Sequence, residues 1–307
     1  MIRRLGNHGT TWSEKTAMPE LPEVEGLVRA LAPEAIGRTI EEVTISDIVI
    51  ASKERGREAI IKGMSTDDFI HQMKHMTIVN VTRRSKYIYM DLEKDHMTYL
   101  LVSHLGMTGA WFVVNTIDEV TELKFRRHIH VVFKMADGGL LVYSDIRRFG
   151  ELRLLETEAD HPPLLKMAPE PFDEEACAHF LDLAVLPKYA RKPIKEVIMD
   201  GQVISGCGNI YATEALYQMK IHPGRKVERI SLIRKTELFH VIVDILQESI
   251  DAGGSTISDY RNINGESGSM QDRLKMYGRK ACLSCFTETK IMKIGGRTSV
   301  YCPKCQR

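Results

Sequence analysis

The sequence contains no apolar segment that could cross a membrane. It has no run of 18 apolar residues, whereas a transmembrane helix needs about 20. The opening segment, MIRRLGNHGTTWSEKTA, also lacks the apolar middle of a secretory signal. These absences exclude a membrane-spanning helix and give no argument for export, so we expect a cytoplasmic protein.

The chain has almost no net charge. Its 42 basic and 41 acidic side chains leave a formal charge of +1 at pH 7. Bulk charge therefore does not predict nucleic-acid binding, which would have to depend on local basic clusters. With 307 residues, 43% of them hydrophobic, the chain is long enough for two domains with separate cores. Composition alone leaves the function open.

Cysteine is scarce, but four of the six cysteines lie close together near the C-terminus. Cys282 and Cys285 form one Cys-x2-Cys pair, and Cys302 and Cys305 form a second pair 16 residues later. Two such pairs can meet in one tetrahedral thiolate site, so we predict one structural Zn²⁺. Four thiolates leave no position for water or substrate. We expect the remaining two cysteines, Cys177 and Cys207, to be small buried residues and not reactive ones.

The first 17 residues differ from the rest of the chain. They are polar, follow no hydrophobic pattern and precede an internal methionine, Met18, so we predict either a disordered leader or a mis-called start at 1–17. From Pro22 onward apolar residues recur at helical spacing. Proline suits the first turn of a helix, and the acidic Glu23 and Glu25 complement its positive end. Pro19 therefore stands just before a helix N-terminus.

The remaining chain divides into a strand-rich and a helix-rich part. Between about 38 and 155, alternating β-branched and aromatic runs and the turn at Asp137-Gly138-Gly139 predict an antiparallel β-sandwich. After Pro162 the spacing becomes helical, and we predict helices near 174–185, 190–200, 209–219 and 231–251. The fold class is α+β. We expect a catalytic sandwich domain at 18–156, a helical domain at 157–270 and a four-cysteine hairpin at 271–307.

Five motifs in sequence order resemble the formamidopyrimidine-DNA glycosylase and endonuclease VIII family. They are MPELPEVE at 18–25, SHLGM at 103–107, DIRRFG at 145–150, GNIYATE at 208–214 and the four-cysteine hairpin. The resemblance covers residues 18 to 306. It implies a β-sandwich flanked by helices, a helix-two-turn-helix DNA-binding domain and a zinc-finger hairpin. It also implies a nucleoid-associated enzyme whose partner is damaged double-stranded DNA, and nothing in the sequence suggests an oligomer.

The resemblance assigns the chemistry to Pro19 and Glu20. In the family, the amine of an N-terminal proline attacks the sugar C1′ of a damaged nucleotide and forms a Schiff base, while the following glutamate transfers protons. A lone proline would more simply start a helix, but Glu20 beside it favours the catalytic interpretation. If translation starts at Met1, Pro19 is a tertiary amide without a free amine. We therefore expect the active form to begin at Pro19.

Two basic residues match family positions that assist strand cleavage. Lys86, in Arg83-Arg84-Ser85-Lys86, resembles a β-strand lysine that contacts phosphate beside the lesion, although a solvated surface lysine is the simpler alternative. Arg297 follows Gly295-Gly296 and matches an arginine at the tip of the zinc hairpin that promotes δ-elimination. The metal would make this tip rigid. Phe286 replaces a common family glycine after the second cysteine.

Six further residues match positions that contact DNA in the family. An enzyme that acts on a base must extrude its nucleotide from the duplex, and inserted side chains then fill the gap. The family match gives this role to Met107, Arg147 and Phe149, although Met107 and Phe149 could also be core residues. The other three matches are His128, Arg191, which we expect at the head of a helix, and Asn209, which we expect to bind phosphate at a helix start.

The substrate class depends on a loop at about 257–271. This loop resembles the base-capping loop of enzymes that act on oxidised purines. We therefore expect removal of 8-oxoguanine and formamidopyrimidines, followed by β,δ-elimination. A preference for oxidised pyrimidines, as in endonuclease VIII, is the alternative within the family, and the stretch near 51–66 is atypical. A non-catalytic, zinc-dependent binder of damaged DNA is the alternative from another class.

Overall fold

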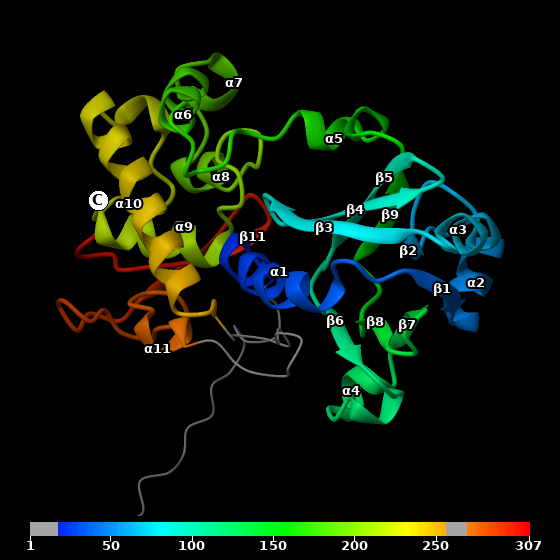
Figure 1. Cartoon of the computed structure of the whole chain (residues 1–307). Helices are drawn as coiled ribbons and strands as arrows, with labels where there is room; N and C mark the ends of the chain where they lie inside the picture. The colour runs from blue at the N-terminus through cyan, green and yellow to red at the C-terminus, as the bar shows by residue number, and fades with distance from the viewer. Residues whose placement is uncertain (1–17, 256–268) are drawn as a thin grey trace, which may run out of the picture.

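A computed structural model describes residues 18–255 and 269–307. Within these residues the chain forms a β-rich domain and a helical domain, with helix α1 (Leu21–Ala35) between them (Figure 1). The expected leader at 1–17 and most of the expected base-capping loop at 257–271 lie outside the described residues. No helix in the described part of the chain is long and apolar enough to span a membrane.

The β-rich domain consists of two sheets. The first has the strand order β1-β7-β8-β6 and comprises β1 (Ile40–Ile45), β6 (Gly109–Val114), β7 (Ile129–Met135) and β8 (Leu140–Asp145). The second has the order β2-β9-β5-β4-β3 and comprises β2 (Ile60–Ile61), β3 (Thr77–Arg84), β4 (Tyr87–Lys94), β5 (Met97–His104) and β9 (Glu151–Leu155). All pairs are antiparallel except β2 with β9. The predicted sandwich is therefore confirmed, with one short parallel pair at its edge.

Large aromatic residues fill the sandwich core. Trp111 and Phe133 are fully buried and stack at 5.9 Å between ring centroids. Within the stretch at about 38–155 that was predicted to be rich in strands, the segment after Ser46 instead forms helix α2 (Asp47–Glu54). Asp47 lies in the first turn of this helix, where its charge complements the helix end, and Val49 is its only buried residue. The β-branched composition of this segment does not decide its structure.

The helical domain confirms three of the four predicted helices and divides the other. Its helices are α5 (Pro162–Leu165), α6 (Ala176–Ala184), α7 (Pro187–Ala190), α8 (Ile194–Ile198), α9 (Asn209–Gln218) and α10 (Leu232–Asp251). The segment expected as one helix at 190–200 breaks before α8, because Pro193 has no N–H and disfavours helical geometry in the residue before it. The remaining helices of the described chain are α3 (Thr66–Met73), α4 (Leu123–Arg126), α11 (Met270–Arg273), η1 (Ile117–Glu119), η2 (Glu158–Asp160) and η3 (Val227–Arg229).

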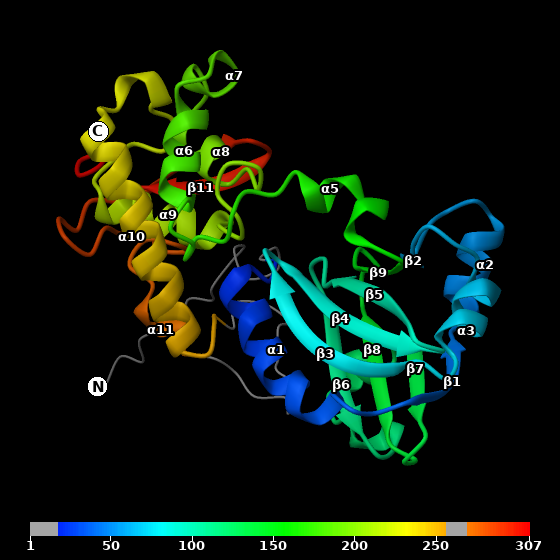
Figure 2. The same cartoon turned by 45° about the horizontal axis from the view of Figure 1, so that its top comes forward.

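Helix α1 contributes to the cores of both domains. Its first residue, Leu21, is buried in the core of the helical domain, whereas Val24, Leu27 and Leu31 are buried in the sandwich core. Figure 2 shows the helix lying between the two domains with its N-terminal end toward α8 and α9. The residues just before α1 are therefore placed where the two domains meet.

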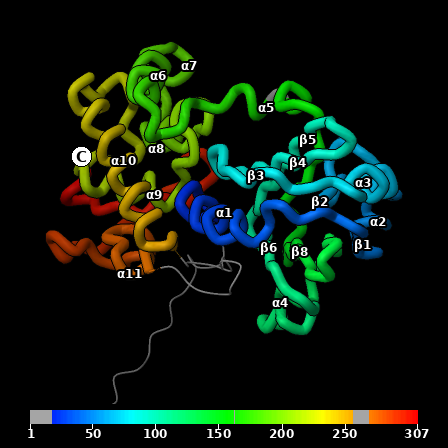
Figure 3. The backbone as a smooth tube through the Cα atoms, viewed as in Figure 1, coloured from blue at the N-terminus to red at the C-terminus, as the bar shows by residue number. Residues whose placement is uncertain are grey.

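The four-cysteine segment forms a β-hairpin against α9. Strands β10 (Lys290–Ile294) and β11 (Arg297–Tyr301) pair antiparallel and are joined by Gly295-Gly296. Both glycines have positive φ, which only glycine adopts without strain. Strand β11 packs against α9 (Figure 3). The hairpin thus brings C-terminal residues back to the domain boundary. The predicted domain limits at 156/157 and 270/271 stay predictions.

Candidate active site at the domain boundary

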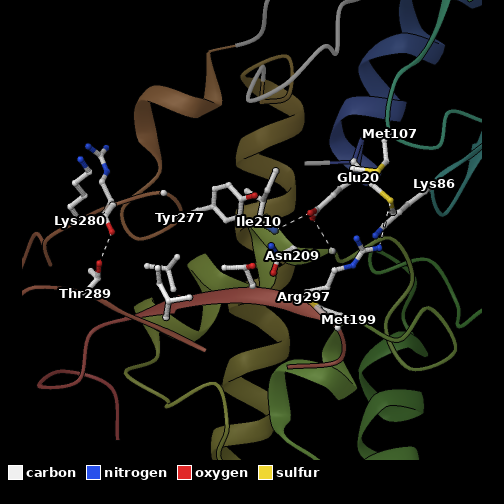
Figure 4. A pocket seen from close by; sticks show the side chains of 18 of the residues that line it. Glu20, Lys86, Met107, Met199, Asn209, Ile210, Tyr277, Lys280, Thr289 and Arg297 are labelled. Carbon is white, nitrogen blue, oxygen red and sulfur yellow. Dashed lines mark hydrogen bonds between the residues drawn. The ribbon is translucent and has the colours of Figure 1, made fainter. Parts of the chain in front are cut away.

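A pocket of about 680 Å³ opens between the two domains and the hairpin (Figure 4). Six of the predicted site residues line it: Glu20, Lys86, Met107, Arg147, Asn209 and Arg297. They come from the start of α1, the β3–β4 turn, the loop before β6, the segment after β8, the start of α9 and the start of β11. Residues far apart in sequence thus form one cavity.

Glu20 is the buried carboxylate of this pocket. Its side chain accepts hydrogen bonds from the backbone N–H groups of Gly208 and Ile210, each at 2.9 Å, and the residue is only 3% exposed. Burial raises the pKa of Glu20 to about 7, although the charge of Lys86 opposes the shift. A carboxyl group with a pKa near neutrality can both donate and accept a proton, which is the property required of a general acid and base.

Close backbone approach explains the glycine at position 208. A Cβ at this position would lie 2.3 Å from the Glu20 carboxyl carbon and 2.5 Å and 2.6 Å from its oxygens. Gly206 is similarly constrained, because its φ is +74° and a Cβ there would lie 2.4 Å from Leu21 Cδ1. The Gly-x-Gly sequence before α9 is therefore required for α1 to reach the N-terminus of α9.

A second buried carboxylate, Glu23, holds Glu20 in place. Its Oε2 accepts the backbone N–H of Glu20 at 2.9 Å. Its Oε1 accepts the Tyr211 hydroxyl and both the N–H and the hydroxyl of Ser255, the latter two at 2.7 Å and 2.8 Å. Sequence reasoning interpreted Glu23 only as a complement to the helix end. Its partners lie about 190 and 230 residues away, so no local pattern indicates them.

Pro19 is buried immediately before Glu20. Met18, the residue before it, lines the pocket, and its Sδ lies 3.6 Å from Nη2 of Arg297. Pro19 thus stands in the chain between two pocket-lining residues, Met18, which contacts Arg297 at the hairpin tip, and Glu20. In this chain the Pro19 nitrogen is part of the peptide bond to Met18.

Lys86 lines the pocket, but not from a strand as expected. It occupies the second position of the two-residue turn, Ser85-Lys86, between β3 and β4, and Ser85 has a φ of 57°. Two-residue hairpin turns require positive φ angles, which glycine, asparagine and aspartate favour. The sequence Ser85-Lys86 therefore does not predict this turn.

The two arginines before this turn, Arg83 and Arg84, form ion pairs with carboxylates of the protein. The guanidinium of Arg83 pairs with Glu25 at 2.9 Å and with Glu170 at 2.6 Å. Arg84 pairs with Glu170 at 2.9 Å and donates to the Ala168 carbonyl at 2.7 Å. These ion pairs join the hairpin to the segment that leads into the helical domain. Removing one partner of such a pair would leave the other charge partly buried and uncompensated, which is costly.

Asn209 starts α9, as predicted, with Gly208 as its N-cap. Its side-chain oxygen is buried and has no hydrogen-bond partner among the described residues. Tyr277 also lines the pocket. Burial raises the pKa of Tyr277 to about 12, so this hydroxyl stays protonated at neutral pH. Sequence reasoning missed Tyr277, which follows the undescribed loop and belongs to no motif.

Met107, Arg147 and Phe149 lie near the pocket opening and are not core residues. Phe149 is 61% exposed, and the guanidinium carbon of Arg147 lies 4.8 Å from its ring centroid. Met107 is half-buried at the pocket wall. The alternative that Met107 and Phe149 fill the hydrophobic core is therefore wrong.

Three predicted DNA-contacting residues do not line the pocket, namely Phe149, His128 and Arg191. His128 precedes β7, and its Nδ1 lies 2.7 Å from the Lys124 carbonyl oxygen. Arg191 is exposed and follows the last residue of α7, so it ends one helix and does not head another.

Lys195 is a buried cation that sequence reasoning missed. The residue is fully buried in α8 and donates from Nζ to the Thr213 hydroxyl at 2.8 Å. Burial lowers the pKa of Lys195 to about 7, although the negative charge of Glu20 opposes the shift. A lysine in a helical pattern normally lies on the solvated face, so the sequence gives no signal for this one.

The four cysteine sulfurs converge as predicted. Their Sγ atoms all lie within 4.8 Å of one another, with 3.8 Å between Cys282 and Cys305 and 3.5 Å between Cys285 and Cys302. Zinc–thiolate bonds of about 2.3 Å in a tetrahedron place sulfurs about 3.8 Å apart. The cluster therefore fits one tetrahedral metal ion. Of the other two cysteines, Cys207 is buried as expected, whereas Cys177 is only half-buried.

Comparison with known sequence families gives two matches in chain order. The N-terminal domain of formamidopyrimidine-DNA glycosylase matches residues 18–152, and the H2TH domain of the same enzyme matches residues 167–261. The fold and the site therefore define a DNA glycosylase with lyase activity that carries a helix-two-turn-helix domain. The chain belongs to the formamidopyrimidine-DNA glycosylase family.

Individual relatives support the assignment over nearly the whole chain. Proteins named formamidopyrimidine-DNA glycosylase from Exiguobacterium sp. and Shouchella clausii are 36% and 38% identical, covering 94% of this chain and 100% and 99% of their own lengths. Solved structures of Lactococcus lactis Fpg with DNA containing an abasic site or an oxidised pyrimidine are each 30% identical with a TM-score of 0.77, covering 94% of this chain and all of theirs. The fold expected from sequence is confirmed.

Proposed function

We propose that the protein removes oxidised purines from DNA through a Schiff base on Pro19 and then cleaves the strand by β,δ-elimination. The observation that carries this proposal is the Glu20 carboxylate. It is buried next to Pro19, held by two backbone N–H groups, and faces a cavity that also contains Lys86 and Arg297. An amine nucleophile, a proton-transfer group and two cations are the parts that such a reaction needs.

The first step requires a free amine at Pro19. We propose that the active form begins at this residue, with Met18 and everything before it absent. The Pro19 nitrogen then attacks C1′ of the damaged nucleotide, the N-glycosidic bond breaks and the base departs with a proton. The sugar ring opens when its oxygen is protonated, which leaves an iminium between Pro19 and C1′. Glu20, with a pKa near 7, supplies a proton to the sugar and later accepts one.

Elimination follows from the iminium. Loss of a proton from C2′ expels the 3′ phosphate, and a second elimination expels the 5′ phosphate before water releases the sugar fragment. Lys86 lines the cavity from the β3–β4 turn and Arg297 from the start of β11. We assign them the neutralisation of phosphates on the two sides of the lesion. Asn209 begins α9, and its side-chain oxygen is buried without a hydrogen-bond partner among the described residues. We assign the side-chain amide N–H groups of Asn209 to phosphate binding.

We assign to Met107, Arg147 and Phe149 the role of filling the gap left by the extruded nucleotide. An exposed phenylalanine stacked with an arginine offers a flat surface for the orphaned base, together with hydrogen-bond donors. His128 and Arg191 lie outside the cavity, so we assign them contacts with the flanking backbone. The DNA substrate would therefore run across the pocket opening and touch both domains.

Zinc is the metal that best suits the four-cysteine cluster. Four thiolates in tetrahedral arrangement prefer zinc among common cellular metals, and the ion would be held by Cys282, Cys285, Cys302 and Cys305. Its contribution is to stabilise the short hairpin that carries Arg297. Removing zinc with a chelator should abolish strand cleavage. The melting temperature of the sandwich domain should fall only slightly.

Oxidised pyrimidines are the second candidate substrates. One solved relative, the Lactococcus lactis protein, is bound to DNA containing an oxidised pyrimidine, and another structure of it holds a benzylated formamidopyrimidine. The same fold thus accepts both base classes in that protein. The relative rates of base removal from the two kinds of lesion distinguish these substrate classes.

The decisive experiment uses protein that starts at Met18, from which cellular processing would expose Pro19. Duplexes containing 8-oxoguanine opposite cytosine, an oxidised pyrimidine or an abasic site are incubated with the enzyme in borohydride. We expect a covalent protein–DNA adduct on all three, with the fastest base removal from 8-oxoguanine and 3′-phosphate ends after cleavage. Glu20→Gln should lose base removal, whereas Glu34→Gln, on the exposed end of the same helix, should behave like wild type.

Three outcomes would contradict the proposal. DNA that is shifted but never cut or trapped would indicate a non-catalytic binder. Faster removal of the oxidised pyrimidine would favour the second substrate class. A fully active protein that still carries residues 1–18, as judged by intact mass, would exclude Pro19 as the nucleophile.

A further inference from the structure

Helix α9 holds the four-cysteine hairpin as well as lining the active site. Its residue Glu214 accepts three consecutive backbone N–H groups, those of Lys275, Met276 and Tyr277, at 2.7 Å, 2.9 Å and 2.6 Å. These residues immediately precede the first cysteine pair. One carboxylate thus fixes the entry of the chain into the hairpin.

One turn further along α9, Tyr217 reaches the cysteine cluster itself. Tyr217 is three residues after Glu214 and therefore lies on the same face of the helix. Its hydroxyl oxygen lies 3.3 Å from Cys282 Sγ and 2.8 Å from Ser284 Oγ. Its ring is 7% exposed and packs with Met276 and the buried cysteines of the hairpin.

The donor in this contact follows from the chemistry of metal ligation. A cysteine that binds zinc is a thiolate, which can accept a hydrogen bond but has no proton to donate. The Tyr217 hydroxyl must then donate to Cys282 Sγ. The Ser284 hydroxyl can in turn donate to the Tyr217 oxygen, so both hydroxyl groups are satisfied.

We propose that Tyr217 is a positioning residue for the metal site, whose hydroxyl donates to the Cys282 thiolate and joins the hairpin to α9. The inference rests on the proposed zinc site. Partners outside the ligand set orient the ligands, and losing one typically weakens metal binding about 10- to 100-fold. Because α9 begins at Asn209 in the active site, the same helix sets where the hairpin stands relative to the pocket.

The test compares Tyr217→Phe with wild type in the full chain. Phenylalanine keeps the packed ring and removes only the hydroxyl. We expect zinc affinity, measured by competition with a chromogenic chelator, to fall about 10- to 100-fold. In cobalt-substituted protein the thiolate-to-metal charge-transfer band should move to lower energy, because the sulfur lone pair loses a hydrogen-bond donor. With zinc in excess, DNA cleavage should stay near the wild-type rate.

Two variants control the experiment. Tyr189→Phe removes the hydroxyl of another buried tyrosine in the helical domain, one that contacts Lys188 and not the cluster, and should change neither the affinity nor the spectrum. Ser284→Ala leaves the Tyr217–Cys282 contact in place and should have a smaller effect than Tyr217→Phe.

The outcomes separate this inference from the proposed function. Equal zinc affinity and identical cobalt spectra for Tyr217→Phe and wild type would overturn the role of Tyr217 while leaving the zinc site intact. Wild-type protein that binds no zinc would overturn both. Neither measurement depends on DNA cleavage, so a failure of the glycosylase assay would not affect the conclusion.

Discussion

Replacing Gly208 with alanine should disable the active site with little change to the rest of the fold. Gly208 has a φ of −118°, which alanine adopts freely, so the substitution adds only a methyl group. That methyl group would lie 2.3 Å from the Glu20 carboxyl carbon. Ordinary contacts between such atoms begin near 3.4 Å, so the carboxylate must move by about 1 Å.

The displacement has two costs. Glu20 would lose good geometry in its hydrogen bonds from Gly208 and Ile210, and overpacking of this kind lowers the free energy of unfolding by about 1–3 kcal/mol. Displacing a catalytic group by about 1 Å reduces the rate about 100-fold. We therefore expect at least a 100-fold slower base removal and a modest fall in melting temperature.

The assay is single-turnover removal of 8-oxoguanine from a duplex, with thermal unfolding measured on the same samples. Gly201→Ala is the matched control, because a Cβ at Gly201 meets no atom within 4 Å, and it should leave both quantities unchanged. If the Gly208→Ala variant removed the base at a rate within about threefold of the wild-type rate, the role assigned to the hydrogen bonds from Gly208 and Ile210 to Glu20 would be wrong.

Three further predictions concern charge and backbone strain. Because burial raises the pKa of Glu20 from 4.5 to about 7, base removal that uses its proton should slow as the pH rises above about 7. The contribution of Glu20 to the free energy of unfolding is fully present below pH 4.5 and is lost as the pH rises through about 7. The loss amounts to about 3 kcal/mol. The difference in unfolding free energy between wild type and Glu20→Gln should therefore change by this amount over the same pH range. Phe286→Gly should raise the free energy of unfolding by about 1 kcal/mol, because Phe286 has a φ of 58°. Glu170→Gln should lower it by about 3 kcal/mol, because it weakens the pairing of Arg83, whose side chain is 8% exposed.

Each of these predictions has its own check. Rates and melting temperatures across pH 4 to 9 address Glu20, and parallel curves for wild type and Glu20→Gln would show that the carboxylate does not titrate in this range. Chemical denaturation of zinc-loaded protein addresses Phe286, where a less stable glycine variant would refute the strain argument. For Glu170, the Asp67→Asn variant on the exposed start of α3 is the control, and equal effects of the two substitutions would contradict a special role for the ion pairs.

Sequence alone predicted the features that depend on local patterns. The sandwich, the α1 start at Leu21-Pro22, the Asn209 helix start and the convergence of the four cysteines all follow from periodicity, capping or ligand spacing. The pocket also gathers residues that only the family resemblance singled out, such as Lys86 and Arg297. Their roles stay predictions, because position in a cavity does not establish chemistry.

The features that sequence did not predict depend on contacts between distant residues. Arg83 and Arg84 pair with Glu170, which no local sequence pattern connects to them. The burial of Lys195 and the contacts of Tyr217 with the cysteines arise only when helices pack. Helix formation at Asp47 likewise overrides the β-branched composition of its segment.

The placement of α1 in both cores also determines when the enzyme can become active during synthesis. Glu20 and Leu21 are made early, yet their partners, Gly206, Gly208 and Ile210, emerge from the ribosome about 190 residues later, and Ser255 later still. An unfinished chain that ends before the helical domain therefore lacks the backbone N–H groups that hold the Glu20 carboxylate. A protein that cuts DNA gains a safeguard from this order, because no fragment that lacks the helical domain can assemble the catalytic centre.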